Sequence, residues 1–139
     1  MNFWPPFWAA GIHIDRVSQD HFEIDVSLKL TFWNRNYVGT AYGGSLYSMC
    51  DPFFMLILIQ QMGRGYIVWD KAACIKFKRP GTKKVFARFK ITPEEVRDFK
   101  EQLKELPKIE PKFLVQIKDI DGTVIAEVEK ILHIRKNSL

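Results

Sequence analysis

One acidic residue, Asp51, stands alone in a long apolar segment and is the strongest candidate for chemistry. Between Gly43 and Gly63 it is the only ionisable acid, and the segment has no Lys, Arg or His. Burying an ionised carboxylate without partners is costly, so Asp51 needs either a water-filled pocket or hydrogen-bond donors. A carboxylate in such a place is suited to act as a general base.

The residues before Asp51 suggest that it faces a cleft. Ser45, Ser48 and Asp51 recur every three residues, which places them along one stripe of a helix that is otherwise apolar. Pro52 removes a helical hydrogen bond and tends to kink the axis beside the acid. The same Asp-Pro pair is also a good helix start, so Asp51 as the cap of a second helix remains an equal alternative.

Two glycines open the same segment and suggest an oxyanion site. Gly43 and Gly44 lack side chains, and a helix beginning there presents free N–H groups to a ligand oxygen. The seven residues from Gly44 to Asp51 correspond to about 10.5 Å along one helix. Both ends of one helix cannot serve one acyl carbonyl, so a shared site requires a second subunit.

Composition indicates an ordinary globular protein. The chain has 139 residues, with 47% hydrophobic and 27% charged, which predicts one domain over residues 1–139 with a real core. Cys50 and Cys74 are spaced for neither a disulfide framework nor a zinc site. The longest apolar run, residues 53–59, is far too short to span a bilayer, and the N-terminus does not resemble a signal peptide. We expect a cytoplasmic protein without membrane or metal partners.

The elements that would position these residues follow from hydrophobic periodicity. Alternation predicts a hairpin from residues 12–14 and 22–30, then a buried helix from about 44 to 62. Two further hairpins are expected, 66–79 with 84–91 around Pro80-Gly81, and 113–120 with 123–135 around Asp121-Gly122. Thr92, Pro93 and Glu95 form the start signal of a short helix near residues 93–106. The order predicts an α+β fold with an antiparallel sheet curled around a helix.

Several segments resemble a known superfamily. Residues 36–44 (Asn-Tyr-Val-Gly-Thr-Ala-Tyr-Gly-Gly), with Asp51 beyond them, resemble the signature of hotdog-fold acyl-CoA thioesterases similar to the phenylacetate-pathway enzymes. Residues 4–7, 66–71 and 77–81 further resemble a branch of that superfamily known mainly as a domain of unknown function. The resemblance spans most of the chain, from Trp4 to Arg135.

This resemblance implies a single hotdog domain, subunits joined edge to edge through their sheets as a homodimer or dimer of dimers, and a site at the dimer interface. Asp51 would act as base or nucleophile, the Gly44 N–H would hold the oxyanion, and Asn36 would orient substrate or water. No cofactor is implied besides the coenzyme A of the substrate. One position differs, since many relatives have His where this chain has Tyr42. The other substrate-binding residues we expect are Gly43, Thr40, Tyr42, Ser48, Lys78 and Arg79.

Basic residues suggest where coenzyme A phosphates would bind. The chain has 21 Lys and Arg against 16 Asp and Glu. If strands 66–79 and 84–91 pair, one sheet face would carry Lys76, Lys78, Arg88 and Lys90, with Arg79, Lys83 and Lys84 at the turn. An ordinary solvated face is the alternative, and no recognition motif points to nucleic acid.

Two functions from different classes fit these features. The first is a hydrolase of acyl-CoA or aryl-acyl thioesters, and the second is a non-catalytic acyl-CoA binding protein on the same scaffold. A hydratase fits less well, because no acid and base His pair accompanies Asp51.

Overall fold

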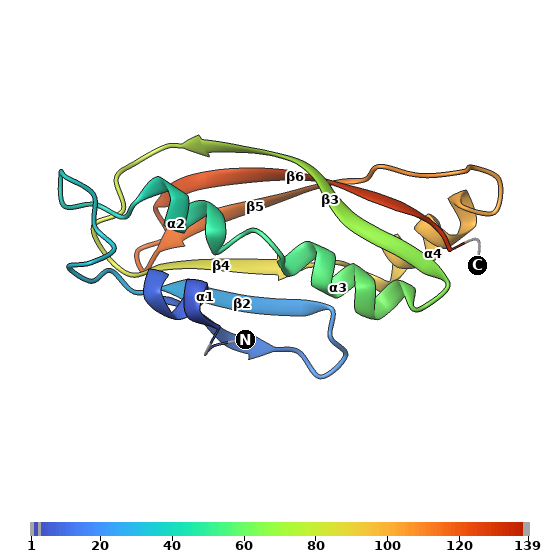
Figure 1. Cartoon of the computed structure of the whole chain (residues 1–139), viewed down its shortest axis with the longest axis horizontal. Helices are drawn as coiled ribbons and strands as arrows, with labels where there is room; N and C mark the ends of the chain where they lie inside the picture. Colours follow the sequence, from blue (N-terminus) through green and yellow to red (C-terminus); the bar gives the residue numbers. More distant parts are fainter. Residues whose placement is uncertain (1, 3, 138–139) are drawn as a thin grey trace.

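The structure, a computed structural model, describes residue 2 and residues 4–137. One antiparallel sheet curls around a layer of short helices that lies against its concave face (Figure 1). This confirms the α+β architecture expected from the alternating segments around an apolar one. The elements in chain order are α1 Pro5–Ala10, β1 Ile12–Val17, β2 Glu23–Leu28, α2 Gly43–Ser48, α3 Phe53–Met62, β3 Tyr66–Phe77, β4 Val85–Lys90, α4 Pro93–Gln102, β5 Lys112–Asp119 and β6 Val124–Lys136.

The six strands are ordered β1-β2-β4-β5-β6-β3. The predicted first and last hairpins are confirmed, since β1 pairs with β2 and β5 pairs with β6. Both joins are short, and the turn between β5 and β6 places Gly122 at a φ of 86°, a conformation that glycine adopts without strain. Strand β3 forms one edge of the sheet, and its outer side pairs with no other strand among the described residues.

The predicted hairpin between 66–79 and 84–91 is wrong. Strand β3 pairs with β6, whereas β4 lies between β2 and β5. The connecting residues are held by other partners, because the N–H groups of Lys78 and Arg79 both donate to Ile125 O and Ala41 N–H donates to Gly81 O. Pro80-Gly81 therefore belongs to a crossover between an edge strand and a central one.

The central apolar segment forms two helices, α2 and α3, where a single helix over 44–62 was expected. The chain turns at residues 49–52, and Pro52 has φ −93° and ψ −8° just before α3. Helix α3 is apolar around most of its circumference, as predicted, and its buried side chains fill the centre of the core. Phe54, for example, stacks on Phe113 of β5 with ring centroids 5.0 Å apart. The largest fully buried residues include Phe53, Phe54, Phe89, Met49, Ile57, Leu58, Ile117, Leu132 and Ile134.

Helix α4 begins where its start signal predicts. Thr92 is the N-cap, Pro93 is the first residue, and Thr92 and Glu95 exchange both hydrogen bonds of a capping box. The helix ends at Gln102, a few residues before the predicted limit near 106, and a turn continues to residue 105. Its buried residues Val96 and Phe99 pack toward the core beside Phe113.

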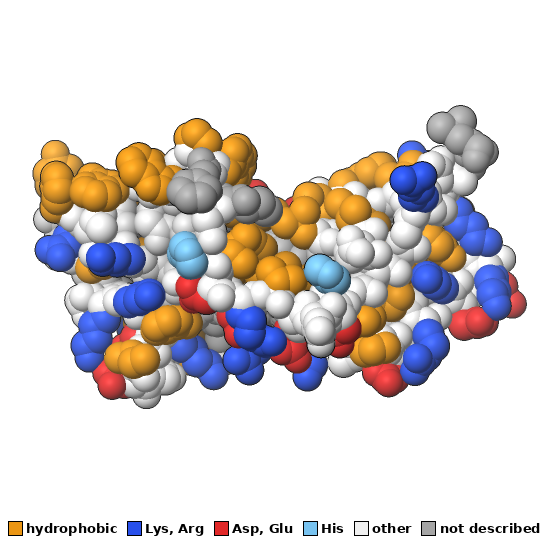
Figure 2. Space-filling model, turned by 90° about the horizontal axis from the view of Figure 1, so that it is seen from below, with side chains coloured by type: hydrophobic (Ala, Val, Ile, Leu, Met, Phe, Trp, Pro, Cys, Tyr) orange, Lys and Arg blue, Asp and Glu red, His pale blue; other side chains and the backbone are white. Residues whose placement is uncertain are grey.

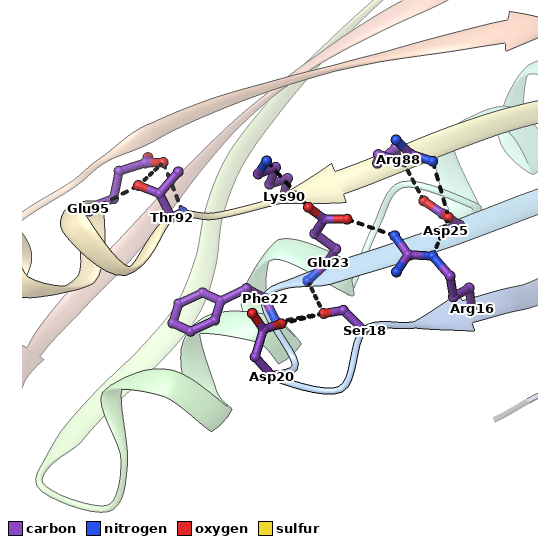
Figure 3. A network of polar contacts seen from close by, with 10 residues as sticks. All are labelled: Arg16, Ser18, Asp20, Phe22, Glu23, Asp25, Arg88, Lys90, Thr92 and Glu95. Atoms are coloured by element: carbon purple, nitrogen blue, oxygen red, sulfur yellow. Dashed lines mark hydrogen bonds and ion pairs between the residues drawn. The ribbon is translucent and has the colours of Figure 1, made fainter.

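The predicted basic sheet face is also wrong, because it depended on the β3–β4 pairing. Arg88 binds Asp25 instead, Lys90 binds Glu23, and Arg16 bridges both acids (Figure 3). Lys76 stands opposite Glu127 on β6. Figure 2 shows acidic side chains interspersed among the basic ones along the lower part of the view, with hydrophobic side chains most numerous at the upper left. None of the helices in the described residues is long and apolar enough to cross a membrane.

Candidate active site

Asp51 lies in the turn between α2 and α3, with 53% of its side chain exposed. The residue at the N-cap of α3 is Pro52, and no side chain caps that helix. The second helix of the alternative interpretation is therefore present as α3, but Asp51 does not cap it. Its Oδ1 accepts hydrogen bonds from Tyr47 Oη at 3.2 Å and from Lys130 Nζ at 3.2 Å.

Lys130 is the partner that this carboxylate required. It lies on β6, on the face turned toward the helices, and none of its side chain is exposed. Its Nζ lies 3.2 Å from Asp51 Oδ1, 3.1 Å from Asp70 Oδ1 and 3.4 Å from Tyr47 Oη. Burying an ammonium is costly unless it is paired, and here two carboxylates supply the pairing.

Asp70 completes the cluster from the neighbouring strand β3. Its Oδ1 is buried and has no other polar partner among the described residues. Burial raises the pKa of Asp70, although the nearby Lys130 ammonium acts in the opposite direction.

Charge and burial also shift the pKa values of Lys130 and Tyr47. Burial alone would lower the pKa of Lys130, but Asp70, Tyr47 and Asp51 more than offset this and the pKa is raised. Lys130 therefore remains an ammonium and does not act as a nucleophile. Burial raises the pKa of Tyr47, so its hydroxyl stays protonated and can donate to Asp51.

A cavity of about 470 Å³ lies beside this cluster. Small side chains from β3 form much of its wall, which leaves room next to the charged groups. Its lining residues are Tyr47, Asp70, Lys71, Ala72, Ala73, Ile75 and Lys130.

The N-terminus of α2 carries the predicted oxyanion donor and is tightly packed. Tyr42 is the N-cap and makes no side-chain capping bond. The Tyr42 ring covers Gly44, where an added Cβ would lie 2.6 Å from Tyr42 Cε1. Similarly, an added Cβ on Gly43 would meet the Phe77 ring at 3.0 Å. At both glycines the missing side chain lets an aromatic ring lie close to the backbone.

Asn36 and Ser48 make local bonds. The Asn36 amide donates to Thr40 Oγ1, and its Oδ1 accepts from the N–H groups of Val38 and Thr40. Asn36 therefore shapes the 36–40 loop. Ser48 Oγ donates to Gly44 O at 2.8 Å, one turn earlier in α2. Direct roles of Asn36 and Ser48 toward substrate remain predictions.

A second cavity, of about 410 Å³, brings together several of the predicted substrate-binding residues. Asn36, Thr40, Gly43, Lys78 and Arg79 all line it, although they come from two separate stretches of the chain. Among the described residues, neither Lys78 nor Arg79 has a carboxylate partner. The cavity is therefore a basic pocket beside the N-terminus of α2.

Within one chain, the predicted site residues thus fall into two groups. One group lines the basic pocket near Gly43, and Asp51 lies at the other end of α2 with Lys130, Asp70 and Tyr47. The sequence reasoning missed these last three residues. A signal was present for Lys130, because it interrupts the inward-facing apolar series Ala126, Val128, Leu132 and Ile134 of β6. No group of His, Cys, Asp and Glu suited to a metal ion occurs in the part of the chain that the structure describes.

Comparison with solved structures assigns the fold. A Pseudomonas aeruginosa protein of unknown function, described as a probable thioesterase, matches with a TM-score of 0.85 and 17% identity over 96% of this chain and 88% of its own. A Haemophilus influenzae thioesterase matches with a TM-score of 0.71 and 15% identity over 97% and 85% of the two chains. A mutant of the phenylacetic acid degradation protein PaaI from Thermus thermophilus matches with 0.62 and 19% over 94% and 98%.

The fold is therefore the hotdog fold, as the resemblance implied. The chain belongs to the family described as Domain of unknown function (DUF4442), which matches residues 1–134. Among curated proteins, none matches this chain.

Proposed function

We propose that this protein hydrolyses acyl-CoA thioesters at a site formed between two subunits, with Asp51 as the reacting carboxylate. The observation that carries this proposal is the geometry of Asp51. Its carboxylate is half exposed at a break in the central helical segment, and its two donors, Tyr47 and Lys130, hold one of its oxygens and line the neighbouring cavity. The structural similarity to proteins described as thioesterases supports the same reaction.

The chemistry requires a base or nucleophile and a donor to the carbonyl oxygen. Asp51 either takes a proton from the attacking water or attacks the thioester carbon itself. The Gly44 N–H of the partner subunit stabilises the negative charge on the carbonyl oxygen. Water is consumed, the C–S bond breaks, and the products are a carboxylic acid and the thiol of coenzyme A.

The free edge of β3 supports an assembly of two subunits. Eleven of the twelve residues of β3 pair with β6, and no described strand pairs with the other side of β3. Exposed strand edges readily pair with another chain. Pairing of β3 with its counterpart would join the two sheets edge to edge. Gly44 begins α2 and Asp51 follows its other end, so one chain cannot bring both to the same carbonyl group. A second subunit can supply the missing Gly44 N–H.

The basic pocket is proposed to hold the phosphates of coenzyme A. Lys78 and Arg79 line it without carboxylate partners and lie beside Gly43. Replacing both by Ala should raise KM for coenzyme A thioesters at least several-fold, since phosphate contacts are charge-assisted. KM for the matching N-acetylcysteamine thioester, which has no phosphates, should stay unchanged. An equal rise for both substrates would contradict this assignment.

The first experiment is a panel of acyl and aryl-acyl coenzyme A thioesters, with release of the thiol measured by a chromogenic thiol reagent. Asp51→Asn and Asp51→Ala should lower kcat by roughly 100-fold or more. Asp98→Asn, on the exposed side of α4, serves as the control and should retain full activity. Unchanged turnover in both Asp51 variants would remove Asp51 from the mechanism.

A mixing experiment tests the shared site. Gly44→Pro removes the N–H donor, and Pro is tolerated in the first turn of a helix, although its ring atoms must also displace the exposed Tyr42 ring. Chains carrying Gly44→Pro and chains carrying Asp51→Ala should each be inactive, because each lacks one half of the site. Co-refolding them at equal amounts should restore about a quarter of the wild-type activity, from one intact site in each mixed dimer. No recovery would show that both groups act within one chain.

A non-catalytic acyl-CoA binding protein is the second candidate. Two observations favour it: the Tyr42 ring covers Gly44, and the Asn36 amide is engaged within its own loop. Tight binding of coenzyme A thioesters in a calorimetric titration, without thiol release from any of them, would select this candidate over the hydrolase.

A further inference from the structure

We infer that Lys130 is the residue that positions Asp51, by anchoring Oδ1 so that Oδ2 is the oxygen that reacts. This inference rests on the proposed function of Asp51 and assigns a role to a residue outside the signature of that site.

The contacts of the carboxylate distinguish its two oxygens. Both hydrogen bonds to Asp51, from Lys130 Nζ and Tyr47 Oη, end at Oδ1. No polar contact of Oδ2 occurs among the described residues, and the side chain is 53% exposed. With Oδ1 held from the protein side, Oδ2 is the oxygen that remains available to water or substrate.

The ammonium of Lys130 is engaged by groups of the protein, through hydrogen bonds to Asp51 and Tyr47 and an ion pair with Asp70. It has three N–H groups, and three oxygens lie within 3.4 Å of Nζ, from Asp51, Asp70 and Tyr47. None of its side chain is exposed. Lys130 therefore acts through Asp51, and its loss should change kcat with little effect on KM.

Asp70 has a separate part in the cluster. A single ammonium faces two carboxylates, and Asp70 is the more enclosed of the two, with 25% of its side chain exposed against 53% for Asp51. Asp70 offsets the cost of burying Lys130, whereas Asp51 uses the Lys130 ammonium for orientation. The structural and positioning roles of Lys130 can thus be separated by mutation.

The test compares Lys130→Met with the double variant Lys130→Met/Asp70→Asn. The single variant leaves the Asp70 carboxylate enclosed without its cation, so its Tm should fall. The double variant removes both enclosed charges, so its Tm should recover toward wild type. In both variants Asp51 lacks its anchor, so kcat should fall roughly 10- to 100-fold while KM changes less than about twofold. Tyr47→Phe removes the second donor and should lower kcat by a smaller factor.

Lys136→Met is the matched control, because Lys136 lies on the same strand with an exposed side chain, and it should retain wild-type kcat. Wild-type kcat in the recovered double variant would overturn the positioning role, while hydrolysis by the wild-type protein would leave the proposed function standing. If the wild-type protein hydrolyses no thioester in the panel, the proposed function fails first and the role of Lys130 fails with it. A fall in kcat that follows Tm across all variants would show that Lys130 acts only on stability and would also overturn the inference.

Discussion

The ring of Tyr42 covers Gly44 so closely that a methyl group added at Gly44 would lie 2.6 Å from Tyr42 Cε1. Tyr42 lies directly before the paired glycines, at the position where the resemblance to hotdog-fold thioesterases leads one to expect His. Since 59% of Tyr42 is exposed, the ring has room to move. The conformation of the Tyr42 ring and the residue type at position 44 are therefore coupled at the start of α2.

This relationship predicts coupling between the two positions. Gly44→Ala in the wild-type background should change the free energy of unfolding by less than about 0.5 kcal/mol, because the gain in helix propensity is offset by displacing the ring. In a Tyr42→Ala background the same change should stabilise by about 1 kcal/mol. Urea denaturation of the four proteins measures the difference. Equal effects in both backgrounds would contradict the contact.

Gly11 should be among the least replaceable glycines. It has a φ of 80°, and an added Cβ would lie 2.6 Å from the carbonyl oxygen of Lys29. Gly11→Ala should cost roughly 3 kcal/mol, from left-handed strain together with the clash. Gly122, with a φ of 86° and open space around it, is the matched control, and Gly122→Ala should cost only about 1 kcal/mol. Equal losses in urea denaturation would show that backbone strain alone acts at Gly11.

The two cysteines should differ sharply in reactivity. Cys50 is completely buried, and burial raises its pKa to about 12, whereas Cys74 is exposed on β3. At pH 8 a chromogenic disulfide reagent should modify one thiol per folded chain and two after unfolding in denaturant. Cys74→Ser should abolish the reaction of the folded protein. Rapid modification of that variant would show that the core around Cys50 opens readily.

Acid should weaken the ion-pair network on the outer face of β1, β2 and β4 (Figure 3). Burial alone would raise the pKa of Asp25, but hydrogen bonds from Arg88 and Arg16 more than offset this and the pKa is lowered. A lowered carboxyl pKa stabilises the fold above the unfolded value near 3.8, and this contribution is lost as the pH falls through the folded value. Asp25→Asn should cost about 1 kcal/mol at pH 7.

The difference between Asp25→Asn and the wild-type protein should shrink as the pH is lowered below 4, as measured by urea denaturation at each pH. A difference that stays constant from pH 7 to pH 3 would mean that Asp25 contributes through shape and not through charge.

Local features were predictable because their partners are close in sequence. The capping box of Thr92 and Glu95 spans three residues, and Asp121-Gly122 joins two strands that pair with each other. Alternation likewise predicted the segments that form β2, β4 and β5. Asp51 stood out because the apolar segment around it contains no other charge.

Strand pairing was less predictable, because a turn signal does not specify which strands lie next to each other in the sheet. Pro80-Gly81 marks a change of direction, and the sequence alone could not distinguish a hairpin from a crossover. Only the curled sheet placed β3 beside β6 and far from β4. The prediction of a basic sheet face was wrong for the same reason, because it assumed that β3 pairs with β4. Asp25 and Glu23 pair with two of its cations, Arg88 and Lys90.

The sequence by itself therefore determined the class of fold, the strands, helix α4 and the one conspicuous acid, since these depend on composition and short-range periodicity. Only the tertiary structure decided how that acid is held. Lys130 and Asp51 are 79 residues apart, and their contact exists because the sheet curls one strand over the turn between two helices. An ammonium enclosed among apolar residues depends on such distant carboxylates, and neither local propensity nor spacing records where they lie.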